Sequence, residues 1–462
     1  MNFIKEHAIL ALALILGSIF WLYVISIFLD EPLRPEVKEA MEWNLPSSAY
    51  EENGYLILLG MNEPAGVDAL TAGKIILENE LQRYQAYKLN QDMAPSKPYS
   101  STDSLFSMKD SLCDYQKQIN CVAFYLAQNH ATRQQLLKKN QFLLERYRSI
   151  RNSRQFVETI PPYPEALIPS YTNLTSAAKL EHVLVISDIS RRRFAAAMDR
   201  LAENAAFAHR LLKEGDSLIA HMIALHMVKN DALILSALMQ KYPQLVQYTA
   251  QISQIVAPIS TREYSEEKAF KREQRNILNL IGHTRTEIIE NWKRKGQGYL
   301  NGLLKLFYSE NATLNLAYDL YNLKVKVASA DGSQLDLEVA NADRESENLY
   351  GTPIISHMIY VRNTGGKLLL QISEPSYLDY VIRHHDTEGF LRLVALQYKL
   401  LAQKIGLTHV PRFLELAGRE YVNPYTLEPM KWNADKRELS FEGRQADKNN
   451  PGKKVRYCAY LP

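Results

Sequence analysis

The chain has 462 residues, and 54 lysines and arginines against 51 aspartates and glutamates give it a formal net charge of +3. Because the sequence has no long run of one charge sign, it gives no support to nucleic-acid binding. Hydrophobic residues make up 46% of the chain, which excludes a largely disordered protein and predicts a body of roughly two or three globular domains.

Residues 8–29 follow a short tail, residues 1–7, and form the uncharged run AILALALILGSIFWLYVISIFL. As a helix this run rises roughly 33 Å, enough to cross a hydrocarbon core of roughly 30 Å. A buried core helix of this length without a polar break is uncommon. A cleaved signal peptide is disfavoured by the length of the run and by Trp21 and Tyr23. We therefore predict one uncleaved transmembrane helix, whose orientation the nearly balanced flanking charges leave open.

Residues 30–160 are predicted to form an N-terminal helical region, because apolar side chains recur at intervals of three, four and seven. One apolar run has strand length and a glycine at each end. A proline-rich break then marks a candidate domain boundary. In chain order, we expect a short helix at 32–45, the strand-length run at 54–60, a helix at 67–90, a long loop at 91–104, a helix at 132–148 and the break at 160–169.

Cys113 and Cys121 lie close together in this region, and their meaning depends on the compartment. In an oxidising space they would form a disulfide that removes on the order of 2 to 3 kcal/mol of unfolded-chain entropy. In the cytosol they would stay inert thiols. A metal site is the third alternative, but the segment 104–128 has no histidine, and Asp114 is a poor substitute for a thiolate or imidazole ligand.

Residues 170–328 are predicted to form a bundle of helical hairpins, because short loops make neighbouring helices antiparallel. Alternating charges in the run EEKAFKREQR, near the end of this region, indicate a solvated face. The expected helices are 174–187, 191–213, 217–229, 232–242, 264–281 and 284–308, with Asn230-Asp231 separating the third from the fourth.

Residues 329–418 have a mixed character at first, because short apolar runs at 335–339 and 368–372 adjoin glycine turns and suggest a small strand or irregular patch. Helices are expected again at 377–405 and 412–417. The tail, residues 419–462, is predicted to contain a small element of two or three β-strands. The apolar residues that indicate this element are Trp432, Leu439, Phe441, Val455 and Tyr457.

Histidines next to acidic residues are the natural candidates for a metal site, but their spacing is unfavourable. His384, His385 and Asp386 are adjacent, and neighbouring side chains on a helix point about 100° apart. His221 and His226 are five residues apart, which misses the spacing of four that places two ligands on one helical face. We therefore interpret these histidines as packing or surface residues.

Two further pairs have a suggestive spacing. His283 and Glu287 are four apart, as in helical metal pairs, although such a pair is more often a simple polar contact. Ser176 and Lys179 match the Ser-x-x-Lys pattern of penicillin-recognising enzymes, but the partner motifs of those enzymes are absent from the sequence. The sequence therefore assigns no catalytic residue, no metal site and no cofactor.

Three stretches carry a resemblance: NGYLILLGMNEPAGVDALTAGK, the two-cysteine block that continues to NQFLLERYR, and NPYTLEPMKWNADKRELSFEG near the C-terminus. Together they resemble a group of uncharacterised single-anchor helical proteins of proteobacteria. The resemblance covers the N-terminal third and the last 40 residues, and Asn423 stands where an aspartate would be expected. It implies an inner-membrane anchor with a periplasmic body, and thereby favours the disulfide, but it implies no catalytic residue.

The sequence thus predicts a mainly α protein, with one transmembrane helix, an extracytoplasmic helical bundle or irregular hairpin array, and a small C-terminal β element. Its partners would be the lipid bilayer, through residues 8–29, and another envelope protein or a cell-wall component. The first functional hypothesis is a non-enzymatic interaction or scaffold protein of the bacterial inner membrane. The alternatives are an envelope hydrolase whose site is assembled from distant segments, and a protein that binds an apolar ligand between helices.

Overall fold

A computed structural model shows a mainly α protein with a small three-stranded antiparallel sheet near the C-terminus, which confirms the predicted fold class at this level. The helices and strands form two compact units, each assembled from separate stretches of sequence. Unit 1 comprises Met1–Trp43, Glu273–Lys326 and Val339–Ser376, and unit 2 comprises Asn44–Arg272, Val327–Glu338 and Tyr377–Pro462. The structure describes residues 17–18, 21, 30–89, 108–115, 120–260, 262–295, 308–350, 363–373, 377–447, 450 and 452–462.

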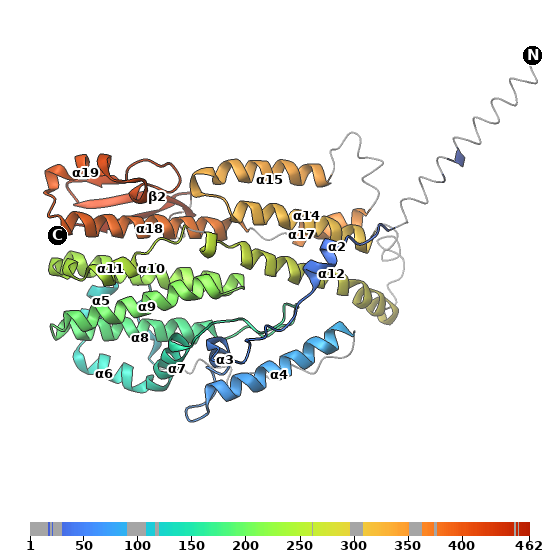
Figure 1. Cartoon of the computed structure of the whole chain (residues 1–462), viewed down its shortest axis with the longest axis horizontal. Coiled ribbons are helices and arrows are strands. Elements are labelled where there is room, and N and C mark those ends of the chain that lie inside the picture. Colours follow the sequence, from blue (N-terminus) through green and yellow to red (C-terminus); the bar gives the residue numbers. More distant parts are fainter. Residues whose placement is uncertain are drawn as a thin grey trace, which may run out of the picture. The chain divides into compact units, whose positions relative to one another are not determined.

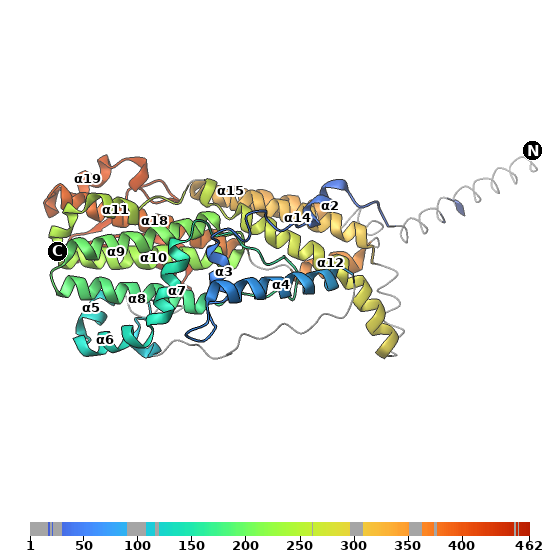
Figure 2. The same ribbon diagram turned by 60° about the horizontal axis from the view of Figure 1, so that its bottom comes forward.

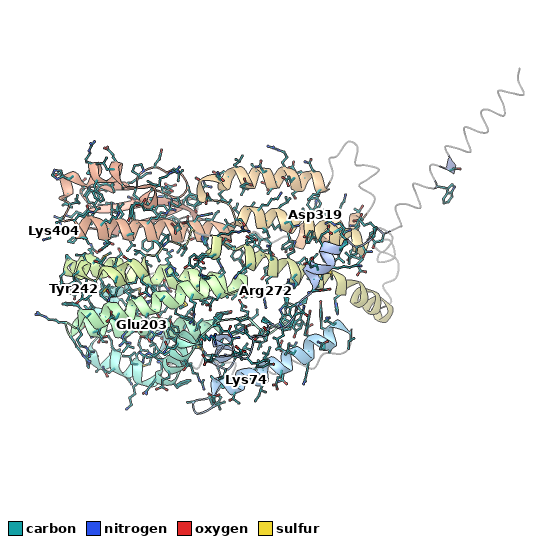
Figure 3. All side chains as sticks on the ribbon, in the orientation of Figure 1. Lys74, Glu203, Tyr242, Arg272, Asp319 and Lys404 are labelled. Atoms are coloured by element: carbon teal, nitrogen blue, oxygen red, sulfur yellow. A yellow bond between two sulfur atoms is a disulfide. The ribbon has the colours of Figure 1, made fainter. Side chains whose placement is uncertain are left out.

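The core of unit 2 is a stack of long helices that run side by side, as Figures 1 and 2 both show. Their shared faces are lined with fully buried aliphatic residues, which supply most of the apolar burial that stabilises this unit. Tyr242, labelled in Figure 3, follows the third helix of the stack and packs its ring 6.0 Å from that of Phe194. The helices are α8 (Tyr171–Ser190), α9 (Phe194–Glu214), α10 (Leu218–Lys241), α11 (Thr249–Ile255) and α18 (Leu378–Ala402).

Helix α10 is a single helix, so the predicted break at Asn230-Asp231 is wrong. Both residues are buried, and Asp231 Oδ1 lies 2.6 Å from His182 Nε2 and accepts a hydrogen bond from Asn204 Nδ2 at 2.7 Å. These two residues favour turns when their side chains bond to the local backbone. Here the Oδ1 of Asp231 is engaged by side chains of α8 and α9 and not by the local backbone, so the helix continues through it.

The run at 54–60 forms a helix, α3 (Gly54–Leu59), and not the strand that its length suggested. Asn53 is fully buried, and its side-chain oxygen accepts a hydrogen bond from the Tyr55 amide, which caps the helix. Helix α3 packs against α4 (Ala69–Lys88). The two backbones approach so closely that a Cβ on Gly73 would lie 1.8 Å from the Leu56 carbonyl oxygen. Only glycine fits there.

Other predicted boundaries are also corrected by the structure. The expected helix at 132–148 is divided at Asn140, whose buried side chain donates to the Leu136 carbonyl. The expected pair at 264–281 and 284–308 is replaced by one continuous helix to Lys295. The apolar runs at 335–339 and 368–372 both lie in helices, and in the first of these helices the acidic residues of the first turn favour helix over strand. The elements are α6 (His130–Lys139), α7 (Gln141–Asn152), α12 (Glu267–Lys295), α15 (Leu335–Tyr350) and α17 (Thr364–Ser373).

The Cys113–Cys121 disulfide is present, with the two Cα atoms 5.7 Å apart, which confirms this prediction. It joins the segment before α5 (Cys121–Ala127) to the start of that helix. Next to it, the hydroxyl of Tyr125 accepts a hydrogen bond from the Cys113 amide at 3.0 Å. Both cysteines are buried in the core of unit 2.

The C-terminal sheet confirms the predicted β element and lies against α18. Its strands are antiparallel in the order β1-β2-β3, and Phe441 and Tyr457 face each other across the second pairing with their rings stacked at 5.0 Å. The strands are β1 (Lys431–Asn433), β2 (Glu438–Ala446) and β3 (Lys454–Tyr460); two short helices, α19 (Val410–Leu416) and η6 (Arg419–Tyr421), precede them.

Unit 1 has its own small apolar core, formed by aliphatic residues from three sequence stretches. The start of α2 (Pro35–Met41) is attached to α14 (Glu310–Ala328) by polar contacts. Arg34 Nη2 donates to the carboxylate of Asp319, labelled in Figure 3, at 2.7 Å. The buried core residues are Val37, Leu278, Ile281, Leu314, Ala317, Leu320 and Leu370.

The predicted transmembrane run lies mainly outside the described residues, which include only Gly17, Ser18 and Trp21 of it, all helical. The loop at 91–104 lies wholly outside them. Within the described part of the chain, α10 is the one helix that is long and apolar enough to cross a membrane, and 67% of its most apolar window is buried inside the protein. That degree of burial is typical of the core helix of a globular unit. The transmembrane helix at 8–29 therefore stays a prediction, as do the sequence-based domain boundaries.

Candidate metal centre

Three buried side chains from distant parts of the sequence converge in unit 2. His221 lies in the first turn of α10, Glu266 immediately precedes α12, and His384 lies near the start of α18. One ligand atom from each residue lies within 4.8 Å of the other two. The exposed fractions of the three residues are 1%, 1% and 4%. The packing of α10 beside α18 therefore assembles a compact group of two imidazoles and one carboxylate.

The spacing of these atoms suits metal coordination better than hydrogen bonding. Glu266 Oε1 lies 3.4 Å from His221 Nε2 and 3.3 Å from His384 Nδ1, which is long for a hydrogen bond between nitrogen and oxygen. None of the three atoms has a hydrogen-bond partner within the described structure, although all are buried. Ligands at about 2.0–2.1 Å from a tetrahedral zinc ion lie roughly 3.3–3.4 Å from one another. The distances from Glu266 Oε1 to His221 Nε2 and to His384 Nδ1 match this ligand-to-ligand distance.

His384 is held in the orientation that a ligand needs. Its Nε2 donates to the Ile259 carbonyl oxygen at 3.0 Å, so the lone pair of the neutral imidazole is on Nδ1, which faces Glu266. One turn further along α18, Glu388 Oε2 accepts a hydrogen bond from the Ile259 amide at 2.8 Å. His384 and Glu388 of α18 thus form hydrogen bonds to the carbonyl and the amide of the buried residue Ile259. Donation from the second ring nitrogen to a carbonyl is a common feature of metal-binding histidines.

The charges in the group reinforce one another. Burial raises the pKa of a carboxyl, but at Glu266 the neighbouring His384 and His221 outweigh burial and hold its pKa below the ordinary value. Burial likewise opposes the charged form of His384, yet Glu266 raises its pKa above the ordinary value. Burial, aided by His384, lowers the pKa of His385 to about 4, so this ring is neutral at pH 7. A buried carboxylate therefore favours a cation at this point.

A cleft with a volume of about 580 Å³ reaches the group from the surface of unit 2. Glu266 and His384 line it, whereas His221 is not one of its lining residues. A metal ion held by the three side chains would therefore be accessible from the cleft. Other charged or titratable side chains that line it include His385, Glu388, Arg392, Arg262, Arg419 and Asp331.

The structure separates the residues that sequence proximity had grouped. Of the adjacent trio, His384 belongs to the centre and His385 lines the cleft beside it. Asp386 points to the sheet instead, where it accepts hydrogen bonds from the Tyr425 hydroxyl at 2.6 Å and from the Arg444 amide at 2.9 Å. Spacing along the chain relates His384 only to its sequence neighbours, and His221 lies far from it in the sequence.

The remaining sequence candidates lie apart from the centre. Lys179 Nζ lies 5.5 Å from the centroid of the Tyr115 ring, and burial lowers its pKa, so its environment is that of a cation over an aromatic face. His226, whose pKa burial lowers to about 4, is not part of the group of three. Of the pair His283 and Glu287, the side chain of Glu287 lies outside the described residues.

Glu266 is the site residue that sequence reasoning missed. It is the first residue of the charged run EEKAFKREQR that predicted a solvated face, and for Glu266 that prediction is wrong, since its side chain is buried. No local pattern distinguishes it from Glu267, whose carboxylate pairs with Lys271 at 2.6 Å near the surface. The difference arises because Glu266 precedes the helix and faces α18.

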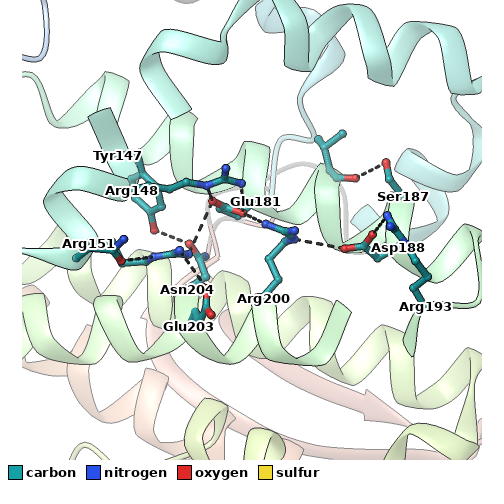
Figure 4. A network of polar contacts seen from close by, with 12 residues as sticks. Tyr147, Arg148, Arg151, Glu181, Ser187, Asp188, Arg193, Arg200, Glu203 and Asn204 are labelled. Atoms are coloured by element: carbon teal, nitrogen blue, oxygen red, sulfur yellow. Dashed lines mark hydrogen bonds and ion pairs between the residues drawn. The ribbon is translucent and has the colours of Figure 1, made fainter. Parts of the chain in front are cut away.

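A second buried carboxylate, Glu181 on α8, forms a network of ion pairs in the same unit (Figure 4). Its oxygens lie 2.8 Å from Arg148 Nε, 3.1 Å from Arg200 Nη1 and 3.8 Å from Arg151 Nη1. With three arginines around one fully buried carboxylate, the charge of Glu181 is compensated. This network is therefore interpreted as structural.

Comparisons of the chain with protein-family models, with curated proteins and with solved structures find no match. The geometry and chemistry of the buried side chains are therefore the basis for inferring a function.

Proposed function

We propose that the protein binds a divalent transition-metal ion, with zinc preferred, through His221, Glu266 and His384, and uses it in a hydrolytic reaction. The observation that carries this proposal is the match between the ligand-atom contacts, 3.3 and 3.4 Å, and the edges of a tetrahedral zinc site. Two histidines and one glutamate with a fourth position left for water are a typical donor set of catalytic zinc. This proposal corresponds to the hydrolase alternative from the sequence.

The chemistry follows from the metal and from the cleft. A zinc ion held by His221, Glu266 and His384 would lower the pKa of a coordinated water and polarise the bond to be cleaved. In the resulting hydrolysis, the water oxygen would replace the leaving group on the carbonyl carbon or phosphorus of the substrate, and a proton would pass to the leaving group. His385 lines the cleft beside His384, where its ring is placed to exchange a proton with the reacting groups.

Cobalt substitution tests the metal centre directly. We expect the full-length chain in mild detergent, dialysed against a chelator, to bind one Co²⁺ and to show the intense visible absorption of a four-coordinate ion. The double variant His221→Ala/His384→Ala should lose this signal. His226→Ala, on the same helix as His221, should keep it. A spectrum that the double variant retains would overturn the proposal, provided circular dichroism shows both variants folded.

Hydrolysis is tested separately with p-nitrophenyl phosphate and p-nitrophenyl acetate. The Zn²⁺-loaded chain should release nitrophenol, and the rate should fall to that of buffer after chelation and return when Zn²⁺ is restored. Release that is insensitive to chelation would contradict a metal-dependent reaction. Stoichiometric metal binding without release of nitrophenol from either ester would leave a metal-binding protein and contradict the hydrolytic part of the proposal.

We further propose that the body lies on the periplasmic side of a bacterial inner membrane, anchored by residues 8–29, with an envelope component as partner. The Cys113–Cys121 disulfide supports an oxidising compartment. In protein quenched and denatured directly from intact cells, a maleimide should label only Cys458 before reduction and all three cysteines after it. In a Cys458→Ser variant, labelling without reductant would contradict the oxidised form.

A further inference from the structure

One face of α18 forms a wall of the cleft that begins at the metal centre. His384, Glu388 and Arg392 follow at intervals of four residues, and all three line the cleft. Residues at this interval lie above one another on a helix, with a rise of about 6 Å per step. The cleft therefore extends from the proposed metal, along two turns of α18 or roughly 12 Å, to an arginine.

Arg392 is fixed in place at that end. Its Nε donates to Glu388 Oε1 at 2.7 Å, and its Nη1 lies 3.4 Å from the Val422 carbonyl oxygen. Glu388 in turn is engaged through its other oxygen with the Ile259 amide. The charges of Glu388 and Arg392 compensate each other, so this pair gives the distal end a rigid guanidinium but no net charge.

Arg419 adds a positive charge at the same end. It is the first residue of η6, three residues before Val422, and it is exposed and lines the cleft. Its guanidinium has no ion-pair partner within the described part of the chain. The third arginine of the cleft, Arg262, lies 3.4 Å from a carboxylate oxygen of Glu267, which also pairs with Lys271, so this carboxylate compensates the charge of Arg262 only in part. Asp331 also lines the cleft, and the next residue, Gly332, approaches His385 so closely that a Cβ on it would lie 3.3 Å from His385 Nδ1, which places Asp331 toward the metal end.

Given the proposed function, on which this step rests, we infer that the cleft takes substrates carrying an oxyanion, a phosphate or a carboxylate, about two helical turns from the bond that is cleaved. Arg419 and Arg392 hold this group, because the guanidinium fork matches the geometry of both oxyanions. The metal engages the opposite end of the substrate. The substrate is thus an elongated anionic ester or amide, and its charged group is remote from the reacting centre.

Nuclear relaxation in the Co²⁺-loaded full-length chain tests this arrangement. Inorganic phosphate is observed by ³¹P resonance and carboxyl-labelled acetate by ¹³C, in separate titrations. We expect at least one of the two probes to bind with a paramagnetic relaxation that places it near 12 Å from the cobalt, too far for coordination. In Arg419→Met, binding of that probe should weaken about tenfold. The control Arg412→Met should not change it, because Arg412 pairs with Glu415 on α19 and does not line the cleft.

The outcomes separate this inference from the one on which it rests. Absence of the four-coordinate Co²⁺ spectrum would overturn both. If the cobalt spectrum is normal, three results would overturn the oxyanion site and leave the metal centre standing. They are that neither probe binds, that a probe binds directly to the metal, or that the two arginine variants bind the probe with equal affinity. Phosphate binding alone or acetate binding alone would identify which oxyanion the distal end prefers.

Discussion

His384→Ala is expected to lower the affinity of the chain for Zn²⁺ at least about a hundredfold. Apparent zinc-binding free energies of about 10–16 kcal/mol are shared among four ligands in zinc fingers, so one ligand accounts for roughly 3 kcal/mol or more. A difference of 1.4 kcal/mol is about a factor of ten in affinity. Glu266→Gln should have an effect in the same direction, because it removes the negative charge between the two imidazoles. Competition with a chromophoric chelator measures the affinities.

His385→Ala provides the matched control for this prediction. His385 is the neighbour of His384 on α18 and is also buried, but its ring is not among the three that converge. We expect its zinc affinity to remain within about tenfold of the wild-type value, because within the described structure its ring makes no hydrogen bond to the three ligands, whereas loss of a hydrogen-bonded outer-shell partner typically costs about ten- to a hundredfold. Equal losses in the His384 and His385 variants would contradict the assignment of ligands.

Glu181→Gln is expected to lower the free energy of unfolding of unit 2 by about 3 kcal/mol. Removing one partner of a buried ion pair typically costs about 3–5 kcal/mol, because the remaining charges lose their compensation. We expect the lower end of this range. Arg148 and Arg200 keep 35% and 27% of their side chains exposed and can regain water, whereas Glu181 is fully buried (Figure 4). Urea denaturation followed by circular dichroism measures the change.

The effect of Glu181 should depend on pH with a definite sign. Burial alone would raise the pKa of this carboxyl, but Arg148 and the other two arginines hold it below the ordinary value. A lowered folded-state pKa contributes stability above the unfolded-state pKa, about 4.3 for glutamate, and that contribution is lost as the pH falls further. The difference between wild type and Glu181→Gln should therefore be constant near neutrality and shrink below about pH 4.

Glu203→Gln is the control for the network. Glu203 pairs with Arg151 at 3.0 Å, but its side chain is 59% exposed, and exposed pairs contribute only about 0–1 kcal/mol. Comparable destabilisation by the two glutamate substitutions, or a Glu181 effect that does not change with pH, would contradict the role assigned to the buried carboxylate.

Features decided by neighbouring residues could be predicted from the sequence. The antiparallel strands around Trp432, Leu439 and Tyr457 have the apolar and aromatic residues of a pleated surface, and the closely spaced cysteines can bridge without long-range information. Where prediction failed, tertiary contacts overrode local preference. Asp231 continues a helix because His182 and Asn204 contact its Oδ1 atom. The run after Asn53 becomes a helix because the Asn53 side chain caps the helix N-terminus.

The candidate site could not be predicted for the same physical reason. His221, Glu266 and His384 share no sequence window, and each is unremarkable among its own neighbours. Only the packing of α10 against α18, with the residue before α12 between them, brings their ligand atoms together. The sequence offered the general form of the proposed site, a hydrolase site assembled from distant segments, as one of its alternatives. It contained no means of choosing the members.

The order of the proposed ligands along the chain has a consequence for biosynthesis. The third ligand, His384, follows the second by more than a hundred residues, and α18 must dock on α10 before the metal can be held. A nascent chain emerging from the N-terminus first therefore offers at most two of the three ligands until most of the body has been made. Metal loading would then mark the end of folding. A truncation before α18 would keep only two of the three proposed ligands and should bind zinc far more weakly.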